Sequence, residues 1–563
     1  MKKQIRKRIL SLFLCAAAVL TAAGCRRETP DAGEDRTGIP TATTTEEGME
    51  NVVYAGKLKY APENYSLWDS WCVEKDGKVW LIHLKGLIDG NIYNMEQENT
   101  RGYGLAESGD LVHWNEKGEI LSVRDSDNPY DVDFRYTGSA IVKDGRCYVF
   151  YTMRKWGGQR IGVAWSDDME HWTEYSANPV LTPDPRWFIG FDPADPGQST
   201  SKTWTDSIDC RDFLVIPDPD GDGYLGYFVA SAEGIYSSSP VSVIGLAKSA
   251  DLLHWEQLGI VYQPTGVSMP EMVDVFEVNG KWYMTLTTGR NNGGTDLFSD
   301  PYISRAQIYA VADTPQGPFL ENPEDNVFIG GQYDSGYSSR TILFRDKLRV
   351  LYTDTNKGRG VLSLPKDVGV TEDGRLRAYY AADLLEGLRV GTLDTAIVAQ
   401  PYTSFGWKTH GGTWYREGDS FSCTTDPNSW QAALFGGVAK NTELCFTVSA
   451  DSTATSFGVV LTNATELTGL DCLQNILVLD RKNNRVYLTD STWELGNCRR
   501  YDFQADTAYE VRVILMGNTL ELYLNGELVF NTGFVNTGRN RMGLFANNGT
   551  VTAGDLILWK LES

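Results

Sequence analysis

Three stretches of this chain repeat one pattern: GLAESGDLVHW at 104–114, GVAWSDDMEHW at 162–172 and GLAKSADLLHW at 245–255. Each begins with small and apolar residues, passes through Ser-x-Asp and ends in His-Trp. A fainter copy, YAVADTPQGPFLENP, begins at Tyr309. Self-similarity of this size indicates a repeat architecture. We expect the three tryptophans to pack between repeats and the three histidines to have a structural role. These residues are Trp114, Trp172, Trp255, His113, His171 and His254.

A hairpin signal precedes each copy of the repeat. Asp76-Gly77, Asp144-Gly145 and Asn279-Gly280 each separate two apolar runs, and a longer Asp/Gly turn follows FLVIP at 213–217. Such dipeptides are the strongest short-range signals for a β-hairpin. A fifth hairpin, TILFRDKLRVLYT at 341–353, lacks a close copy of the tryptophan motif after it. Five hairpins, each followed by a further strand, predict an all-β fold with a five-bladed β-propeller over 53–390. The alternative is a set of unrelated hairpins in two sandwiches.

The pattern changes after residue 390. Alternating runs such as AYEVRVILMG, TLELYLNGELVF and GDLILWKLE predict strands, and Asn525-Gly526 predicts another hairpin turn. We therefore expect a β-sandwich over 400–563. A chain of 563 residues is also too long for one ordinary core, so two folded domains fit its length.

The composition is that of a folded, acidic protein. Hydrophobic residues make up 42% of the chain and aromatic residues 12%. The net charge of −23 argues against nucleic acid and anionic membrane surfaces as partners, but not against a neutral carbohydrate. The nine cysteines show no CxxC spacing, so no metal cluster is expected. Disulfide pairing among four of them is left open: Cys423, Cys445, Cys472 and Cys498.

The N-terminus has the organisation of an export signal. Residues 1–25 carry a basic start, an apolar stretch and small residues before Cys25. The ending LTAAGC at 20–25 resembles the lipobox of bacterial lipoproteins, which implies that Cys25 is lipidated. An ordinary signal peptide and a short membrane anchor are the alternatives. Residues 26–52 lack an apolar period and predict a flexible tether. We expect the protein outside the cytoplasm, lipid-anchored to a membrane of a bacterial cell envelope.

Acidic and aromatic residues stand just before the predicted hairpins. In a propeller the first strands of the blades line the axis, so the segments at their starts meet on one face. We expect Asp69, Asp212 and Glu271 to converge there, although any one of them alone fits a turn or cap. Three carboxylates in an aromatic pocket suit glycoside chemistry, because one acid protonates the leaving oxygen and an ionised one attacks the anomeric carbon. The segments are LWDSW at 67–71, FRYTGS at 134–139, DCRDF at 209–213, MPEMVD at 269–274 and YDSGYSSR at 333–340.

These segments carry a resemblance to a known clan. LWDSW resembles the VWDSW nucleophile motif of levansucrases, and YTGS at 136–139 resembles the FSGS segment that helps to bind a fructosyl unit. Arg211-Asp212 resembles the Arg-Asp of an RDP motif, and EMVD at 271–274 resembles ECPD, with Phe213 and Val273 in place of the prolines. EDGRLRAYYAADLLEGLR, from Glu372, resembles the segment that leads into a C-terminal sandwich. The chain thus resembles the furanosidase clan of glycoside hydrolase families 32 and 68, and family 32 in particular.

The resemblance implies roles for these residues. Asp69 would be the nucleophile and Glu271 the general acid/base. Asp212 would hold the fructosyl hydroxyls and stabilise the transition state, and Arg211 would orient these carboxylates. The other residues that we expect to bind substrate are Trp68, Trp71, Tyr136, Thr137, Ser139, Asp274 and Asp334.

The implied reaction is retaining hydrolysis of β-fructofuranosidic bonds in fructans or sucrose-like sugars, without a metal or other cofactor. Retention requires the two reacting carboxyls about 5–5.5 Å apart. One alternative is an inverting, arabinofuranosidase-like enzyme with carboxyls about 6.5–9.5 Å apart. The other is a glycan-binding surface lipoprotein without catalysis.

Overall fold

The computed structural model describes most of the chain after residue 57. The described residues are 58–88, 102–123, 134–155, 158–190, 209–233, 241–264, 267–290, 300–303, 305–331, 336–356, 359–400, 412–462, 475–490, 496–504, 507–517, 519–532 and 540–562. Contacts divide the chain into Met1–Glu47 and Gly48–Ser563, and all described residues belong to the second unit. The predicted signal, the tether and Cys25 therefore lie outside the described residues.

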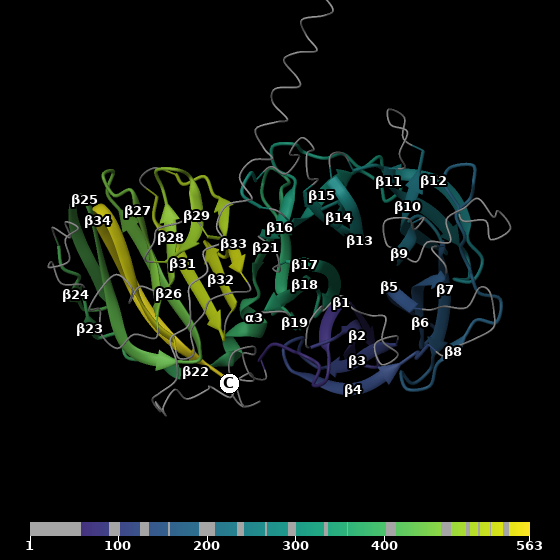
Figure 1. Cartoon of the computed structure of the whole chain (residues 1–563), viewed down its shortest axis with the longest axis horizontal. Coiled ribbons are helices and arrows are strands. Elements are labelled where there is room, and N and C mark those ends of the chain that lie inside the picture. The colour runs from purple at the N-terminus through teal and green to yellow at the C-terminus, as the bar shows by residue number, and fades with distance from the viewer. Residues whose placement is uncertain are drawn as a thin grey trace, which may run out of the picture. The chain divides into compact units, whose positions relative to one another are not determined.

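The strands among the described residues before 332 form four separate antiparallel sheets of four strands each (Figure 1). Within each sheet, neighbouring strands in sequence are neighbours in space, as the hairpin signals predict. The first sheet contains β1 (Ser66–Lys75), β2 (Lys78–Gly86), β3 (Tyr103–Ser108) and β4 (Trp114–Ile120). The second contains β5 (Phe134–Lys143), β6 (Arg146–Lys155), β7 (Gly158–Ser166) and β8 (Thr173–Glu174). The third contains β9 (Cys210–Pro217), β10 (Tyr224–Ala232), β11 (Val241–Ser249) and β12 (Glu256–Tyr262). The fourth contains β13 (Val267–Val278), β14 (Lys281–Arg290), β15 (Arg305–Ala312) and β16 (Val327–Gly331).

Where the sequence predicts five blades, four sheets of the described residues stand alone in a propeller-like arrangement. The fifth hairpin belongs to an eighteen-stranded sheet that continues into the C-terminal strands. The pairing of Tyr379 with Glu527 makes the connection. The strands before this junction are β17 (Tyr337–Phe344), β18 (Lys347–Asn356), β19 (Arg359–Leu362), β20 (Lys366–Val370) and β21 (Leu376–Tyr380), followed by α3 (Ala382–Leu385) and η4 (Glu386–Leu388).

The first strands form a closed ring that fixes the propeller-like arrangement. β1 contacts β5, β5 contacts β9, β9 contacts β13, β13 contacts β17, and β17 contacts β1. Figure 1 shows these strands nearest to the middle of the ring, with β4, β8 and β12 toward its outside. Segments that are far apart in the sequence therefore meet around one axis.

The C-terminal strands form two runs that share one long strand. In one run, β30, β29, β28 and β27 lead to the first half of β34, which also pairs with β25. In the other, β33, β32, β31 and β26 lead to its second half. The strands are β22 (Arg389–Thr392), β23 (Ile397–Ala399), β24 (Tyr415–Glu417), β25 (Ser420–Ala439), β26 (Asn441–Ala450), β27 (Ser456–Thr462), β28 (Asn475–Asp480), β29 (Arg485–Thr489), β30 (Cys498–Arg500), β31 (Tyr509–Met516), β32 (Thr519–Leu524), β33 (Glu527–Thr532) and β34 (Asn540–Leu561).

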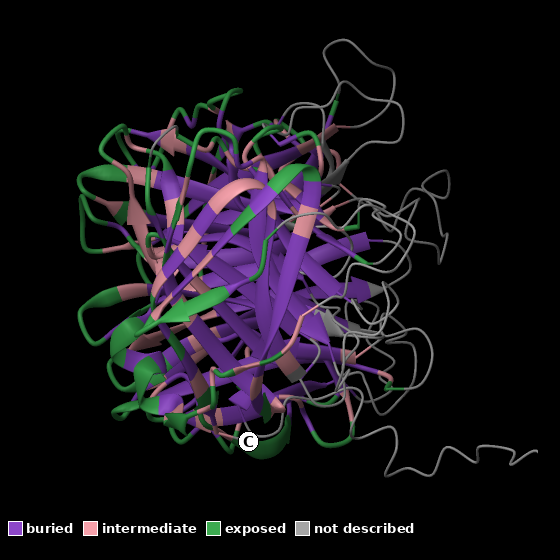
Figure 2. Cartoon of the chain, turned by 90° about the vertical axis from the view of Figure 1, so that its left-hand side faces the viewer, coloured by how far each residue is buried: buried purple, intermediate pink, exposed green. Residues whose placement is uncertain are grey.

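One buried cluster joins the two C-terminal runs. It includes Phe457 and Leu477 from the first run with Phe446 and Leu522 from the second. Burial of apolar side chains from both layers is the main favourable contribution to such a fold. Figure 2 shows this end of the molecule, with buried residues along the strands and exposed residues concentrated in the connections. The predicted boundary between 390 and 400 stays a prediction, because contacts place 48–563 in one unit.

The repeated sequence pattern forms the same turn three times. In the first copy, Ser108 Oγ accepts from Leu111 N at 2.9 Å, and Asp110 Oδ1 accepts from His113 N at 2.8 Å. His113 Nδ1 lies 2.7 Å from Asp110 Oδ2, and Trp114 packs on a core cluster. The copies at Asp168 and Asp251 repeat these contacts. The structural roles predicted for the tryptophans and histidines are confirmed.

Two further observations bear on the predictions. Cys423, Cys445 and Cys498 are free thiols, so they form no disulfide with one another, while Cys472 lies outside the described residues. Among the described residues, no helix has both the length and the apolar character needed to cross a membrane.

Candidate active site

Every first strand in the ring carries a β-bulge near its start. The regular pairing of β1 with β2 is interrupted between Leu67 and Ser70, and that of β5 with β6 between Tyr136 and Gly138. Equivalent shifts lie at 211–214 in β9, 271–274 in β13 and 337–340 in β17. A bulge inserts one residue and redirects side chains, and it is common beside active sites. The bulges therefore lie within the segments that the sequence analysis predicted to converge.

Three bulge residues adopt a backbone conformation that is unusual for residues with side chains. The φ angles are 59° at Asp212, 55° at Met272 and 52° at Ser338. Positive φ costs free energy in residues other than glycine and persists where the surroundings enforce it. Here backbone N–H groups are held across the ring: Asp212 N donates to Thr152 Oγ1 at 3.0 Å, and Ser338 N donates to Thr287 Oγ1 at 3.1 Å.

Asp69 lies in the β1 bulge and is 5% exposed. Its two carboxylate oxygens accept hydrogen bonds from hydroxyls of different elements. Ser338 Oγ in β17 donates to Oδ1, and Thr137 Oγ1 in β5 donates to Oδ2. Both donors favour the ionised carboxylate, which is the form that a nucleophile needs.

Glu271 lies in the β13 bulge, with its side chain 26% exposed. Tyr337 Oη donates to its Oε2 at 2.6 Å, and Arg211 Nη1 lies 3.8 Å from its Oε1. Partial exposure of a carboxyl that is held by a neighbouring hydroxyl suits a group that exchanges a proton with a bound molecule.

Asp212 is buried in the β9 bulge and is held by two hydrogen bonds. Its Oδ2 accepts from Arg211 Nη1 at 2.7 Å and from Met272 N at 2.8 Å. Arg211 in turn donates through Nη2 to Pro270 O at 2.8 Å. These contacts tie β9 to β13 and fix the orientation of the Asp212 carboxylate.

The three carboxylates lie close enough to affect one another's protonation. Burial raises the pKa of Asp69 to about 7, with further increases from the charges of Glu271 and Asp212. Burial also raises the pKa of Glu271, while Arg211 lowers it and Asp212 raises it. The predicted convergence of Asp69, Asp212 and Glu271 is therefore present in the structure.

Among the other predicted residues, one contacts a carboxylate of the trio and two are buried against neighbouring strands. Thr137 contacts Asp69 directly. Trp71 is 3% exposed in a core cluster and stacks edge-on against Tyr103 with ring centroids 5.4 Å apart, which favours a packing role over contact with a sugar. Ser139 is also buried, and its Oγ accepts from Val215 N at 3.2 Å.

Asp274, Tyr136 and Trp68 lie in the bulged segments and accept hydrogen bonds from neighbouring strands. Asp274 Oδ2 accepts from Thr341 N at 2.7 Å, which joins β13 to β17. Tyr136 is buried, and its hydroxyl accepts from Arg154 Nη1 at 3.1 Å. Trp68 is half-buried at the core edge, and its carbonyl accepts from Thr353 Oγ1 at 2.9 Å. Asp334 lies outside the described residues.

The sequence analysis missed the contact residue Ser338, and it placed Tyr337 near the axis without giving it a role. Both stand in the quoted segment YDSGYSSR, but a tyrosine and a serine at a strand start have no distinctive spacing. The signal that identifies them is the bulge in β17, which lies at the same place as the bulges that carry Asp69 and Glu271.

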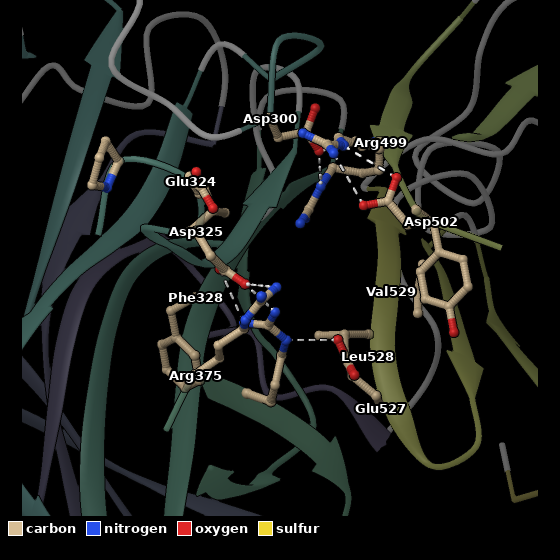
Figure 3. A pocket seen from close by; sticks show the side chains of 15 residues that line it. Asp300, Glu324, Asp325, Phe328, Arg375, Arg499, Asp502, Glu527, Leu528 and Val529 are labelled. Carbon is tan, nitrogen blue, oxygen red and sulfur yellow. Dashed lines mark hydrogen bonds and ion pairs between the residues drawn. The ribbon is translucent and has the colours of Figure 1, made fainter. Parts of the chain in front are cut away.

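A separate cavity of about 810 Å³ lies between propeller strands and C-terminal strands (Figure 3). None of the three carboxylates lines it. Arg377 Nε pairs with Glu527 Oε1 at 2.9 Å and Arg499 Nε with Asp300 Oδ2 at 2.8 Å across it. These ion pairs connect the propeller strands to the C-terminal strands.

Comparisons with known proteins agree with this fold. Residues 91–342 match the model of the Glycosyl hydrolases family 32 N-terminal domain. This range includes Asp212 and Glu271, whereas Asp69 precedes it. The vacuolar acid beta-fructofuranosidase 2 of a Rosa hybrid cultivar is 26% identical over 286 residues, which cover 47% of this chain. The chain spans only 38% of the length of that protein.

Solved structures show the fold over a larger part of the chain. The family 32 beta-fructofuranosidase of Bombyx mori has a TM-score of 0.62 at 16% identity, covering 90% of this chain and 93% of that one. The exo-inulinase of Aspergillus awamori has a TM-score of 0.63 at 15% identity, covering 91% and 99%. Together, these findings show that this chain is similar to the glycosyl hydrolases of family 32, in sequence over residues 91–342 and in fold over 90% of its length.

Proposed function

We propose that this protein is a retaining glycoside hydrolase that cleaves β-fructofuranosidic bonds in fructans or sucrose-like sugars. The observation that carries the proposal is the meeting of Asp69, Asp212 and Glu271 from three sheets in a chain that matches the model of the family 32 N-terminal domain. The supporting substrate class comes from relatives: a variant of the Bombyx mori enzyme was solved with sucrose, and a Schwanniomyces occidentalis fructofuranosidase with fructosylnystose.

In the proposed first step, an Asp69 carboxylate oxygen attacks the anomeric carbon. The bond from that carbon to the leaving oxygen breaks, and the proton of Glu271 passes to the leaving oxygen. In the second step, water attacks the same carbon, Glu271 takes a proton from this water, and the bond to Asp69 breaks. The hydroxyl contacts to both oxygens of Asp69 stabilise the ionised state to which it returns.

Asp212 and Arg211 support the transition state in this proposal. The Asp212 carboxylate is fixed by Arg211 and by the N–H of Met272, so it does not need to reorganise during the reaction. A carboxylate in this position can accept hydrogen bonds from substrate hydroxyls and face the positive charge that develops on the sugar ring.

The test is fructose release from sucrose, inulin and levan by the full chain, with Asp69→Asn and Glu271→Gln as variants. We expect turnover by the wild type and a loss of at least about 100-fold in either variant. NMR detection of the first-formed anomer separates retention from inversion. Inverted product would support the arabinofuranosidase-like alternative, and glycan binding without turnover by the wild type would support a non-catalytic role.

We further propose that β17–β20 serve as the fifth blade and that the C-terminal strands form a sandwich. The closed ring of five first strands and the bulge that β17 shares with the others support the first part. The buried cluster that spans both C-terminal runs supports the second.

We also propose export and lipidation at Cys25, on the basis of the lipobox-like LTAAGC at 20–25. The test is metabolic labelling with a radioactive fatty acid in a bacterial host, followed by membrane fractionation. Label and membrane association should both be lost in Cys25→Ser. Unlabelled wild-type protein in the medium would indicate an ordinary signal peptide instead.

A further inference from the structure

We propose that Tyr337 and Ser338, consecutive residues of the β17 bulge, are positioning residues that hold the two reacting carboxylates in opposite roles. Ser338 keeps Asp69 prepared for attack, and Tyr337 places the transferable proton of Glu271 on one defined oxygen. This inference rests on the proposed function, because it assigns Asp69 and Glu271 the roles of nucleophile and acid.

The geometry of β17 makes the two contacts depend on each other. Successive side chains of a regular strand point to opposite faces, so neighbouring residues do not both reach one site. The bulge at Tyr337 and a φ of 52° at Ser338 break this alternation. Tyr337 therefore reaches Glu271 on β13, while Ser338 reaches Asp69 on β1.

The contact of Tyr337 defines where the acid proton resides. The Tyr337 hydroxyl donates to Oε2 of Glu271 at 2.6 Å. A protonated carboxyl has one O–H and one acceptor oxygen. With Oε2 accepting from Tyr337, the proton that Glu271 delivers belongs on Oε1. The same hydrogen bond then stabilises the carboxylate that remains after the proton has left.

The contact of Ser338 orients the proposed nucleophile, Asp69. Its hydroxyl donates to Oδ1 of Asp69, while Thr137 donates to Oδ2. Each oxygen retains a second lone pair for the substrate. Two donated hydrogen bonds oppose the burial that favours a neutral Asp69, and they fix the rotation of its carboxylate.

The bulge is itself supported by buried polar residues of the fourth sheet. Ser338 N donates to Thr287 Oγ1 on β14 at 3.1 Å. Gln307 on β15 is fully buried, and its Nε2 donates to Thr287 Oγ1 at 2.6 Å and to Gly336 O at 2.9 Å. The backbone on both sides of Tyr337 is thus attached to a neighbouring sheet, so the position of β17 is set by the ring.

Charged groups from other strands also face the two carboxyls. The charge of Asp212 raises the pKa of both carboxyls, and the charge of Glu271 raises the pKa of Asp69. Arg340 faces Asp69, while Arg211 and Arg305 face Glu271. These groups remain when a hydroxyl is removed from Tyr337 or Ser338, so a change in either variant reports the missing hydrogen bond.

The two substitutions should act on different limbs of the pH profile of kcat/KM. The Ser338 hydroxyl lowers the pKa of Asp69, so its loss raises that pKa, and activity on the acid side then requires a higher pH. The Tyr337 hydroxyl lowers the pKa of Glu271, so its loss raises that pKa, and Glu271 stays protonated to a higher pH. Ser338→Ala should therefore move the acid limb upward, and Tyr337→Phe should move the basic limb upward.

The experiment measures kcat/KM of the full chain on sucrose or inulin from pH 4 to 9. We expect each limb to move by about one pH unit, with kcat about tenfold lower. Ser338→Gly removes the same hydroxyl and accepts a positive φ, so it serves as the second variant if Ser338→Ala folds poorly.

Matched controls remove one buried hydroxyl elsewhere. Tyr227→Phe loses a hydrogen bond to Pro315 O, and Ser249→Ala loses contacts in a turn of the third sheet. Both should leave the pH limbs of the wild type in place. Unchanged limbs in folded Ser338 and Tyr337 variants, or movement of the same limb in both, would overturn the inference.

A measurement without turnover separates this inference from the proposed function. The titration of the Asp69 and Glu271 carboxyls is followed by carbon-13 NMR with selectively labelled protein. The wild type could hydrolyse no fructoside while Ser338→Ala still raises the pKa of Asp69 and Tyr337→Phe still raises that of Glu271. The positioning role of Tyr337 and Ser338 would then hold, and the proposed substrate would be wrong. Unchanged pKa values of both carboxyls in the two variants would overturn the positioning role of Tyr337 and Ser338, whatever the activity.

Discussion

At the scale of single residues, burying the carboxylates of this site in their ionised form costs free energy. Asp69 is buried beside two other acids, and its pKa is raised to about 7. A carboxyl with a raised pKa in the folded state binds its proton more tightly there than in the unfolded chain. Its contribution to stability is therefore complete at low pH and is lost as pH rises through the folded pKa.

Asp69→Asn should consequently stabilise the protein above neutral pH. Relative to wild type, we expect the free energy of unfolding to increase more at pH 8 than at pH 5, and the two increases should differ by about 3 kcal/mol at most. Urea unfolding at the two pH values measures this. An equal effect at both would show that the charge of Asp69 is not the cause.

Glu271→Gln should separate acid catalysis from nucleophilic attack. With sucrose, whose leaving group needs a proton, we expect the rate to fall about 10²–10⁴-fold. With fructosyl fluoride, whose leaving group does not, most of the rate should remain. The lost negative charge also lowers the pKa of Asp69, so the acid limb with the fluoride should move to lower pH. Equal losses on both substrates would contradict this role.

At the scale of elements, the bulged first strands depend on polar contacts from their neighbours. Thr152 on β6 donates to Thr137 O at 2.8 Å and accepts from Asp212 N at 3.0 Å, so one hydroxyl connects two bulges. A valine there has a similar shape but leaves both backbone groups buried without that partner, which costs free energy.

Thr152→Val should therefore affect both stability and catalysis. We expect a loss of about 1–3 kcal/mol in the free energy of unfolding and a lower kcat. Denaturant unfolding and initial rates measure the two effects. The exposed Thr424→Val, whose hydroxyl contacts Thr550 Oγ1 on the C-terminal strands, provides the control and should leave kcat unchanged. Normal stability and kcat in Thr152→Val would show that the bulges do not need this contact.

At the scale of the whole folded unit, a buried charged network joins the propeller strands to the C-terminal strands. Lys366 on β20 donates to Glu521 on β32 at 2.6 Å, and both side chains are almost fully buried. Tyr352 on β18 donates to Glu521 as well, at 3.3 Å. A buried charge that loses its partner costs much more than the pair contributes.

Glu521→Leu should destabilise the fold by about 3–5 kcal/mol, because Lys366 is left charged and buried. The double variant with Lys366→Met should recover a large part of this loss. Thermal or denaturant unfolding of the two single variants and the double variant measures the coupling. Additive losses would mean that the two side chains are energetically independent despite their contact.

The sequence was sufficient for the features that depend on local hydrogen bonding and on repetition. Asp-Gly and Asn-Gly turns, alternating apolar runs and the Ser-x-Asp turns before Trp114, Trp172 and Trp255 each depend on residues a few positions apart. Their repetition predicted the propeller-like plan, and the acidic residues before the hairpins predicted the convergence of Asp69, Asp212 and Glu271. Local patterns of this kind are readable because the interacting groups are close in the chain.

Only the tertiary structure decided which sheets stand alone and which hydroxyls hold the carboxylates. The fifth hairpin shares a sheet with the C-terminal strands through pairings of residues about 150 positions apart or more, such as Tyr379 with Glu527. Ser338 reaches Asp69 across 269 positions, and only because β17 closes the ring against β1. The free energy of such contacts depends on how the ring closes, and no local pattern in the sequence encodes that.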